Sequence, residues 1–220
     1  MFHVKHDDQP MPSETPPAPE VARGVFSVSL PLAEMYAELL ATEGTVRGLI
    51  GPREVPRLWE RHLVNCALVG DLVTEGATVC DIGSGAGLPG IVLAIRRPDL
   101  GVTLVEPLLR RTIFLEEVID RLGLGNVEVV RARADALHGS RTFDVVTSRA
   151  VAPMDRLAGW SLPLLRTGGS FLAMKGSSVQ AELDSAARAI SAGRGQLDGV
   201  IELGADLLDP PVRVVRVLKE

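Results

Sequence analysis

Cysteine and aromatic residues are scarce in this sequence. Its 220 residues include two cysteines and one tyrosine, and aromatic side chains make up 4% of the total. Two cysteines cannot supply the framework of a disulfide-stapled extracellular domain, so we expect Cys66 and Cys80 to be buried, reduced thiols of a cytoplasmic protein. So few aromatic rings also argue against a surface that stacks on several successive bases of a nucleic-acid strand.

Long apolar runs, clustered metal ligands and an excess of basic charge are missing as well. No apolar run is long enough to cross a membrane, and residues 1–10 lack the apolar centre of a secretory signal, so we expect no membrane association. The four histidines and two cysteines show no metal-ligand spacing, and we predict no metal site. The formal net charge of −5 argues by itself against a nucleic-acid partner.

Composition and length indicate a single globular domain with short extensions. Residues 1–24 hold five prolines among acidic and small polar residues, and we expect them to form a flexible tail. Apolar residues then recur at helical spacing over 27–43 and 57–73. These patterns predict an N-terminal helical cap, residues 25–74, ahead of the main domain, residues 75–220.

Short apolar runs alternate with helical patterns in the main domain. We expect strands at 77–82, 102–106, 127–130, 143–147, 169–174, 199–203 and 212–218, and helices at 89–97, 109–122 and 179–190. Strands separated by helices indicate a mostly parallel sheet with helices on both faces. The last two strands leave no room for a helix between them, so we predict a C-terminal antiparallel hairpin. The expected fold class is α/β with a Rossmann-like sheet.

A glycine-rich segment lies between the first expected strand and the helix after it. Residues 81–90 read DIGSGAGLPG, and Gly85, Gly87 and Gly90 fit the pattern G-x-G-x-x-G. Glycines allow positive φ angles and let a ligand approach the backbone, and the following helix offers free N–H groups and the positive end of its dipole. This context favours a nucleotide-binding site, with a plain tight turn as the alternative. We call residues 83–90 the glycine loop.

An acidic residue, Glu106, ends the second expected strand, 19 positions after Gly87. A carboxylate there can accept hydrogen bonds from ribose hydroxyls, but NAD and S-adenosylmethionine both carry a ribose. Three other features favour S-adenosylmethionine. Asp81 would repel a pyrophosphate, although it could order the loop or meet the cationic end of a methionine. A single sheet leaves no second domain for a hydride-transfer substrate, and a closing hairpin suits a methyltransferase. We therefore predict a class I methyltransferase, with NAD binding as the alternative.

Several motifs occur together in this chain. They are Trp59-Glu60-Arg61-His62-Leu63, the segment 81–90, Val105-Glu106-Pro107 followed by Arg110-Arg111, Ala132-Arg133-Ala134-Asp135, Thr147-Ser148-Arg149-Ala150-Val151-Ala152, and Met174-Lys175-Gly176. With this combination the chain resembles, over residues 25–218, the RsmG family of bacterial rRNA methyltransferases, also called glucose-inhibited division protein B. The glycine loop alone would not single out that family.

The resemblance implies a reaction, a cofactor and a substrate. It implies methylation of N7 of a guanosine in the 530 loop of 16S rRNA, a component of the small ribosomal subunit, with S-adenosylmethionine as the methyl donor. We expect a monomer without an obligate protein partner.

The resemblance also implies cofactor contacts at five positions, to which the ribose argument adds Glu106. The five positions are Gly83, Leu88, Ala134, Asp135 and Arg149. Family members often have glutamate at the position of Asp135 and an aromatic residue at that of Leu88. The shorter acid and the aliphatic side chain are expected to loosen the contacts with adenine.

Guanine N7 already carries an in-plane lone pair, so its methylation needs no general base. The protein has to align the reactants and supply a polar pocket for the charge that moves from sulfur to the purine. The sequence accordingly predicts no catalytic pair. Arg149 follows the fourth expected strand, where substrate meets cofactor in open α/β sheets. It is the candidate for alignment, as a clamp on the cofactor or on an RNA phosphate, with a surface ion pair as the alternative.

RNA contacts are expected from Arg61, His62 and Lys175. The alternatives are a packing or helix-surface role for His62 and a solvated strand end for Lys175, while Asp135 could be a helix N-cap instead of a cofactor contact. Further arginines concentrate near the loops between the elements and would form a phosphate-binding patch despite the acidic net charge; otherwise they are ordinary solvated charges. They are Arg57, Arg96, Arg97, Arg110, Arg111, Arg131, Arg133 and Arg141.

Two other functions stay open. The acidic net charge favours a methyltransferase of the same fold that acts on a small molecule. The third hypothesis is a nucleotide-binding module without enzymatic activity.

Overall fold

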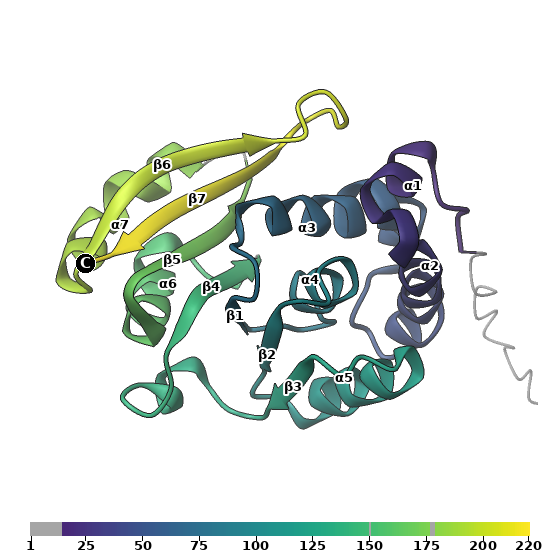
Figure 1. Cartoon of the computed structure of the whole chain (residues 1–220), viewed down its shortest axis with the longest axis horizontal. Helices are drawn as coiled ribbons and strands as arrows, with labels where there is room; N and C mark the ends of the chain where they lie inside the picture. The colour runs from purple at the N-terminus through teal and green to yellow at the C-terminus, as the bar shows by residue number, and fades with distance from the viewer. Residues whose placement is uncertain (1–14, 150, 177–178) are drawn as a thin grey trace, which may run out of the picture.

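The computed structural model describes residues 15–149, 151–176 and 179–220 (Figure 1). Residues 1–14 of the predicted tail lie outside the described residues, and so does Ala150 of one motif.

Helix α1, Glu20–Phe26, begins inside the segment that the sequence predicted as a flexible tail. Ala22 and Phe26 of this helix are buried, and the Phe26 ring meets the Trp59 ring edge to face at a centroid distance of 6.3 Å. The prolines before residue 20 suggested a flexible chain, whereas the burial of these two apolar side chains orders residues 20–24.

The cap, residues 25–74, is helical over the two stretches predicted, but each stretch changes pitch along its length. The first contains the 3-10 turn η1 (Ser27–Ser29), helix α2 (Leu30–Leu39) and the π-helical turn η2 (Leu40–Gly44). The second contains the 3-10 turn η3 (Pro52–Arg57), the π-helical segment η4 (Leu58–Val64), helix α3 (Asn65–Leu68) and the 3-10 turn η5 (Val69–Leu72). Tyr36, Leu40 and Leu63 are fully buried and join the cap to the main core.

Within the described residues, seven strands form one sheet in the order β3-β2-β1-β4-β5-β7-β6. They are β1 (Thr78–Ile82), β2 (Gly101–Val105), β3 (Val127–Val130), β4 (Phe143–Arg149), β5 (Leu165–Lys175), β6 (Gly195–Leu203) and β7 (Val212–Lys219). The first five strands run parallel, and β7 pairs antiparallel with both β5 and β6, which confirms the predicted α/β fold with its C-terminal hairpin. The strand order reverses at β1, and ligands of such sheets bind beyond the carboxyl ends of the strands at this point.

Helices cover both faces of the sheet. They are α4 (Gly90–Arg96), α5 (Leu109–Leu122), η6 (Ala134–Leu137), α6 (Met154–Ser161), η7 (Leu162–Leu164) and α7 (Val179–Ala192). In Figure 1 the cap, α4 and α5 lie to the right of the sheet, and α6 and α7 lie to the left. Successive residues of β1 enter the two separate cores, Val79 on the cap side and Cys80 on the other, so the central strands are buried on both faces.

Helix α6 was not predicted from the sequence. Its buried residues Met154, Leu157, Ala158 and Ser161 follow one helical face. The helix is short and lies between two prolines, Pro153 at its N-cap and Pro163 in the turn η7 that leads into β5, so its pattern covers only two turns.

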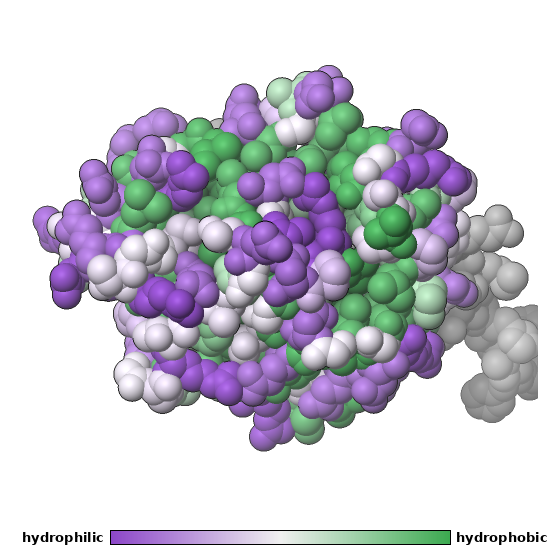
Figure 2. Space-filling model, viewed as in Figure 1, coloured by the Kyte–Doolittle hydropathy of each residue, from purple (hydrophilic) through white to green (hydrophobic). Residues whose placement is uncertain are grey.

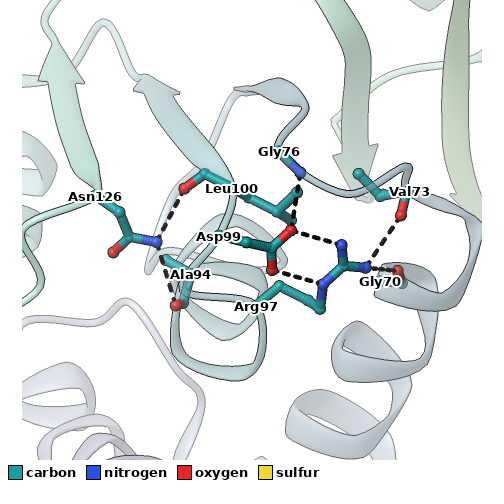
Figure 3. A network of polar contacts seen from close by, with 8 residues as sticks. All are labelled: Gly70, Val73, Gly76, Ala94, Arg97, Asp99, Leu100 and Asn126. Atoms are coloured by element: carbon teal, nitrogen blue, oxygen red, sulfur yellow. Dashed lines mark hydrogen bonds and ion pairs between the residues drawn. The ribbon is translucent and has the colours of Figure 1, made fainter.

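One polar network ties the cap to the main domain at the amino ends of the strands (Figure 3). Arg97 Nη1 donates to the carbonyls of Gly70 at 2.8 Å and Val73 at 3.0 Å, and its Nε and Nη2 bind the two carboxylate oxygens of Asp99. The hydrogen bond from Arg97 lowers the pKa of Asp99 to about 2. Beside it, the Asn126 side chain donates to the carbonyl of Leu100 at 3.0 Å.

By length and composition alone, the helical run Glu20–Gly44 is long and apolar enough to cross a membrane. Its apolar residues Ala33, Tyr36 and Ala37 are nevertheless buried against the rest of the protein. Its charged side chains Arg23 and Glu38 are exposed, and Figure 2 shows hydrophilic side chains interspersed with hydrophobic ones over the cap, at the right of the view. This separation of buried apolar side chains from exposed charged ones is typical of a helix packed on a protein core.

The Arg97 network predicts a defined stability loss. Arg97→Met should lower the free energy of unfolding by roughly 1–3 kcal/mol, because it leaves the carbonyls of Gly70 and Val73 without their donor. Arg121→Met on the exposed face of α5 is the matched control and should change it by less than about 0.5 kcal/mol. Urea denaturation measures both, and equal effects of the two substitutions would show that the network does not stabilise the cap.

Candidate active site

The glycine loop leaves β1 at the switch point of the sheet and leads into α4. Gly87 has a φ of 99°, and a Cβ atom there would lie 2.9 Å from the Tyr36 hydroxyl. A Cβ atom on Gly90 would lie 2.8 Å from Asp81 Oδ2. No side chain fits at either position without displacing a neighbour, so packing requires both glycines, and the positive φ of Gly87 adds a conformational requirement there.

Asp81 supports the glycine loop from beneath. Its side chain is fully buried, and Oδ2 accepts a hydrogen bond from the Gly90 N–H at 3.0 Å. The Ser84 hydroxyl donates to the carbonyl oxygen of Asp81 at 2.8 Å. Burial raises the pKa of Asp81 to about 7, against the lowering effect of the Gly90 N–H. Of the two roles considered for this carboxylate, the geometry supports the ordering of the loop.

The single tyrosine of the chain connects the cap to the same loop. The Tyr36 hydroxyl donates to the Ala86 carbonyl at 2.7 Å in a fully buried position. Sequence reasoning counted Tyr36 among the apolar residues of a cap helix and missed this bond. No local pattern signals it, because the two residues lie 50 positions apart.

A cavity of about 640 Å³ opens beside the glycine loop. This volume is in the range of small-molecule sites. Its walls come from the loops after four parallel strands and from the cap. All six residues expected to contact a cofactor line it, and they are Gly83, Leu88, Glu106, Ala134, Asp135 and Arg149. Sequence reasoning missed other lining residues, including Leu49 and Ile50 of the cap and Trp160 of α6.

Three hydrogen bonds fix the carboxylate of Glu106 beside this cavity. It is 1% exposed, and its Oε2 accepts hydrogen bonds from the Gly85 N–H at 3.1 Å and from Arg111 Nη1 at 3.3 Å. Its Oε1 accepts one from the Leu108 N–H at 3.0 Å. A carboxylate oxygen has two lone pairs, so Oε1 retains capacity for a ligand hydroxyl.

Asp135 lies in the turn η6, which follows β3 in the chain. Arg133 occupies the N-cap position of this turn and Asp135 is its second residue, so the N-cap alternative for Asp135 is wrong. Asp135 Oδ1 lies 3.3 Å from Arg133 Nε, and about half of its side chain is exposed to the cavity and solvent.

Arg149 ends β4 and reaches across to the cap. Its Nη2 lies 2.5 Å from Nδ1 of His62, and its Nη1 donates to Cys66 Sγ at 3.4 Å. Among the described residues its contacts are therefore with the cap, and the surface ion pair that was the alternative is not formed. Cys66 and Cys80 are both buried and free, as predicted.

His62 is buried between Arg149 and Glu54. It is 7% exposed, and its Nε2 lies 2.8 Å from Glu54 Oε2. Burial, and next the positive charge of Arg149, lower the pKa of His62 to about 4. The imidazole is thus neutral at pH 7, and a proton on Nε2 satisfies both of its contacts. His62 lines the cavity, while Arg61 is a half-exposed neighbour whose Nη1 lies 3.5 Å from Glu54 Oε1.

Lys175, the third residue expected to contact RNA, lies at the end of β5 with its amine turned inward. Its side chain is 8% exposed, and Nζ donates to the Ala152 carbonyl at 2.9 Å and to Glu182 Oε2 at 2.7 Å. Glu182 also accepts a hydrogen bond from the Met154 N–H. Lys175 therefore holds the segment after β4 against α7, and it is not the solvated strand end considered from the sequence.

The arginines expected to gather near the cavity are divided between the carboxyl and the amino ends of the strands. Arg96 and Arg97 end α4 and contact Ala67, Gly70 and Val73 ahead of β1. Arg141 precedes β4 and pairs with Glu128. A helix that starts at the carboxyl end of one strand must finish near the amino end of the next, so this part of the expected patch faces away from the cavity.

A family model described as rRNA small subunit methyltransferase G matches residues 29–206, which is most of the chain. The chain belongs to this family, GidB. A Nocardioides sp. relative named Ribosomal RNA small subunit methyltransferase G is 62% identical over 93% of this chain and 82% of the relative. A relative of the same name from Thermobifida fusca is 58% identical over 90% of this chain and 84% of the relative.

Solved structures with lower identity share the fold of this GidB chain. A ribosomal protein L11 methylase from Lactobacillus delbrueckii subsp. bulgaricus has a TM-score of 0.54 at 16% identity, over 71% of this chain and 77% of that one. M. jannaschii TYW2 in complex with AdoMet has a TM-score of 0.56 at 18% identity, over 73% of this chain and 75% of that one. At these identities the likeness shows the fold, which is that of methyltransferases.

The burial of neutral His62 predicts a pH-dependent contribution to stability. Its pKa is about 4 in the folded protein against 6.5 when unfolded, so protonation favours unfolding. The contribution is complete above pH 6.5 and is lost as the pH falls towards 4. The free energy of unfolding of the wild type should therefore rise by roughly 3 kcal/mol relative to that of His62→Asn as the pH increases through this window. Urea denaturation measures this difference.

Asp81 supplies an internal comparison, because its contribution to the free energy of unfolding changes with pH in the opposite direction. Its pKa is about 7 in the folded protein and 3.8 when unfolded, so its contribution to stability is lost as the pH rises from 4 to 7. The stability difference between the wild type and Asp81→Asn should therefore shrink as the pH rises. A His62→Asn difference that does not vary with pH would contradict the neutral, buried imidazole.

Proposed function

We propose that this chain transfers the methyl group of S-adenosylmethionine to N7 of a guanosine in the 530 loop of 16S rRNA. Membership of the GidB family supports an rRNA substrate, and relatives with more than half of their residues identical carry the name of a small-subunit rRNA methyltransferase. The observation that carries the proposal is the cavity beside the glycine loop, which joins Glu106, Asp135 and Arg149 in one site.

The residues around the cavity fit S-adenosylmethionine. Glu106 would accept hydrogen bonds from the ribose hydroxyls through Oε1, while Ala134 and Asp135 would hold the adenine, with Leu88 against its ring. The buried Nε of Arg111, which also lines the cavity, has no hydrogen-bond partner among the described atoms, and a polar ligand would satisfy it. Gly83 would bring its backbone close to the methionine portion.

When bound, S-adenosylmethionine supplies an electrophilic methyl group on a sulfonium ion. The lone pair of guanine N7 needs no deprotonation, so the residues of this chain have to align the two reactants and exclude water. His62 lines the cavity and would be the imidazole available to act as a general base. Both of its ring nitrogens, however, are already in contact with protein groups, Nε2 with Glu54 and Nδ1 with Arg149. This engagement supports a transfer without a general base, in which Arg149 aligns an anionic group of the ligand or the RNA.

RNA phosphate contacts are assigned, in this proposal, to Arg61, whose side chain is 55% exposed. His62 and Lys175 act within the protein, through Arg149 and Glu182 respectively. We further propose that the enzyme acts on 16S rRNA or the small ribosomal subunit in the cytoplasm, as a monomer, and that residues 25–74 form the cap and 75–220 the catalytic domain.

A methyltransferase for a small molecule is the second candidate. The net charge of −5 favours it, and five arginines of the expected phosphate patch are paired with acidic side chains within the chain. Family membership argues for RNA nevertheless, because it spans the cap and the whole cavity.

Mass mapping of rRNA tests the substrate directly. The protein should transfer labelled methyl groups from S-adenosylmethionine to 16S rRNA or small subunits of a strain that lacks the modification, and nuclease mapping should place the methyl group on a guanosine of the 530 loop. Unfractionated small-molecule extract serves as the competing substrate. Transfer to the extract without transfer to RNA would favour the second candidate.

Glu106 tests the cofactor site. Glu106→Gln should weaken the binding of S-adenosylhomocysteine by on the order of tenfold, because hydrogen bonds to a charged acceptor contribute about 1.5–3 kcal/mol. Glu116→Gln on the exposed face of α5 removes the same charge away from the cavity and should leave the affinity unchanged. Calorimetry measures both; equal affinities of two folded variants would place the ligand elsewhere.

A further inference from the structure

Glu54, His62 and Arg149 form a chain of contacts that runs from the cap to the cavity. Glu54 Oε2 lies 2.8 Å from Nε2 of His62, and Nδ1 of His62 lies 2.5 Å from Nη2 of Arg149. We propose that Glu54 and His62 are positioning residues, which set the guanidinium of Arg149 in the cavity to bind an anionic group. The proposal rests on the methyl transfer proposed above and adds two residues of the cap to its machinery.

The backbone around Glu54 is suited to presenting a fixed carboxylate. Glu54 lies in the 3-10 turn η3, Pro52–Arg57, which contains two prolines and is fixed to the core by fully buried Val55. Proline rings restrict φ, so this turn has little freedom to move. Sequence reasoning assigned no role to Glu54, and no local pattern shows that it meets a histidine eight positions later.

The chemistry of the three side chains allows one order of donors and acceptors. An ionised carboxylate only accepts hydrogen bonds and a guanidinium only donates them. The imidazole between them must therefore carry its proton on Nε2 and present the lone pair of Nδ1 to Arg149. Glu54 selects this tautomer, as a carboxylate does for the far nitrogen of many functional histidines.

The surroundings of His62 keep the ring in its neutral form. The charged groups that face it are Glu54 from η3, Arg149 from β4 and Arg61 from its own segment. Burial and the two arginines oppose protonation more than Glu54 favours it. A proton on Nδ1 would place one N–H donor against another and break the contact between His62 and Arg149.

Arg149 retains N–H donors for a ligand. Its Nη2 is directed to His62 and its Nη1 to Cys66 Sγ, both on the cap, while the residue itself lines the cavity. A guanidinium has five N–H donors, and two of them are used in these contacts. The others can bind a carboxylate or a phosphate oxygen, and these two groups are the methionine carboxylate of the donor and an RNA phosphate.

A set of matched variants tests this assignment. Glu54→Gln keeps the size of the side chain but no longer fixes the tautomer, and Glu60→Gln removes one charge from an exposed position on the same cap segment. His62→Asn keeps an acceptor near the position of Nδ1, whereas His62→Leu has none. Urea denaturation of each variant establishes that it is folded before function is measured.

Two functional measurements separate the ligands of Arg149. Relative to Glu60→Gln, both Glu54→Gln and His62→Leu should reduce function on the order of ten- to a hundredfold, with His62→Asn recovering most of it, because a displaced aligning group has effects of this size. If Arg149 binds the donor, the loss appears in the affinity for S-adenosylhomocysteine but not for adenosine. If it binds RNA, the affinity is kept and the KM for small subunits rises.

Nitrogen NMR of the imidazole supplies a readout that does not depend on activity. In the wild type at neutral pH, Nδ1 of His62 should be unprotonated and Nε2 protonated, and Glu54→Gln should mix the tautomers. A protonated Nδ1 in the wild type overturns the proposal. So does Glu54→Gln that matches Glu60→Gln both in affinity and in methyl transfer. A wild type that binds S-adenosylhomocysteine but does not methylate RNA would refute the RNA substrate, while the NMR and affinity measurements would still decide the role of Glu54.

Discussion

The attachment of the glycine loop to its surroundings is the constraint on which the site depends. The loop is bound from three directions: Asp81 holds the Gly90 N–H from β1, Tyr36 holds the Ala86 carbonyl from the cap, and Glu106 holds the Gly85 N–H from the end of β2. All three side chains are at most 1% exposed, so water does not compete for these hydrogen bonds. The cavity next to the loop is therefore formed before a ligand arrives, and a preformed site binds at a lower entropic cost.

The cap contributes to this site in a way that its sequence does not reveal. It closes one side of the cavity with Leu49 and Ile50, and it orients Arg149 of β4 through His62 and Cys66. Arg97 also binds Gly70 and Val73 beside the amino ends of the strands, so the second cap stretch is held at both of its ends. A catalytic sheet alone would leave Arg149 free to rotate into solvent.

Local patterns predicted those elements whose ends are determined locally. Helix α5 was predicted with its observed ends because Gly123, in the left-handed conformation, terminates it, and strand β3 because its apolar run is bounded on both sides. Strand β5 starts at Leu165, earlier than predicted, since pairing with Phe143 extends it. That the residues after the four parallel strands would line one cavity was predictable, because parallel strands end on the same side of the sheet. Other features depend on tertiary packing, which no local pattern records. They are the contacts of Tyr36 and Glu54, the partial separation of the arginines and the inward orientation of the Lys175 amine.

We propose that the glycine loop and Glu106 enclose the adenosyl portion of a methyl donor and not a redox dinucleotide. Calorimetry of the full chain with S-adenosylhomocysteine and with NAD tests it most directly. We expect saturable one-to-one binding of S-adenosylhomocysteine and no measurable heat with NAD. Binding of NAD together with silence towards the sulfur compound would contradict it.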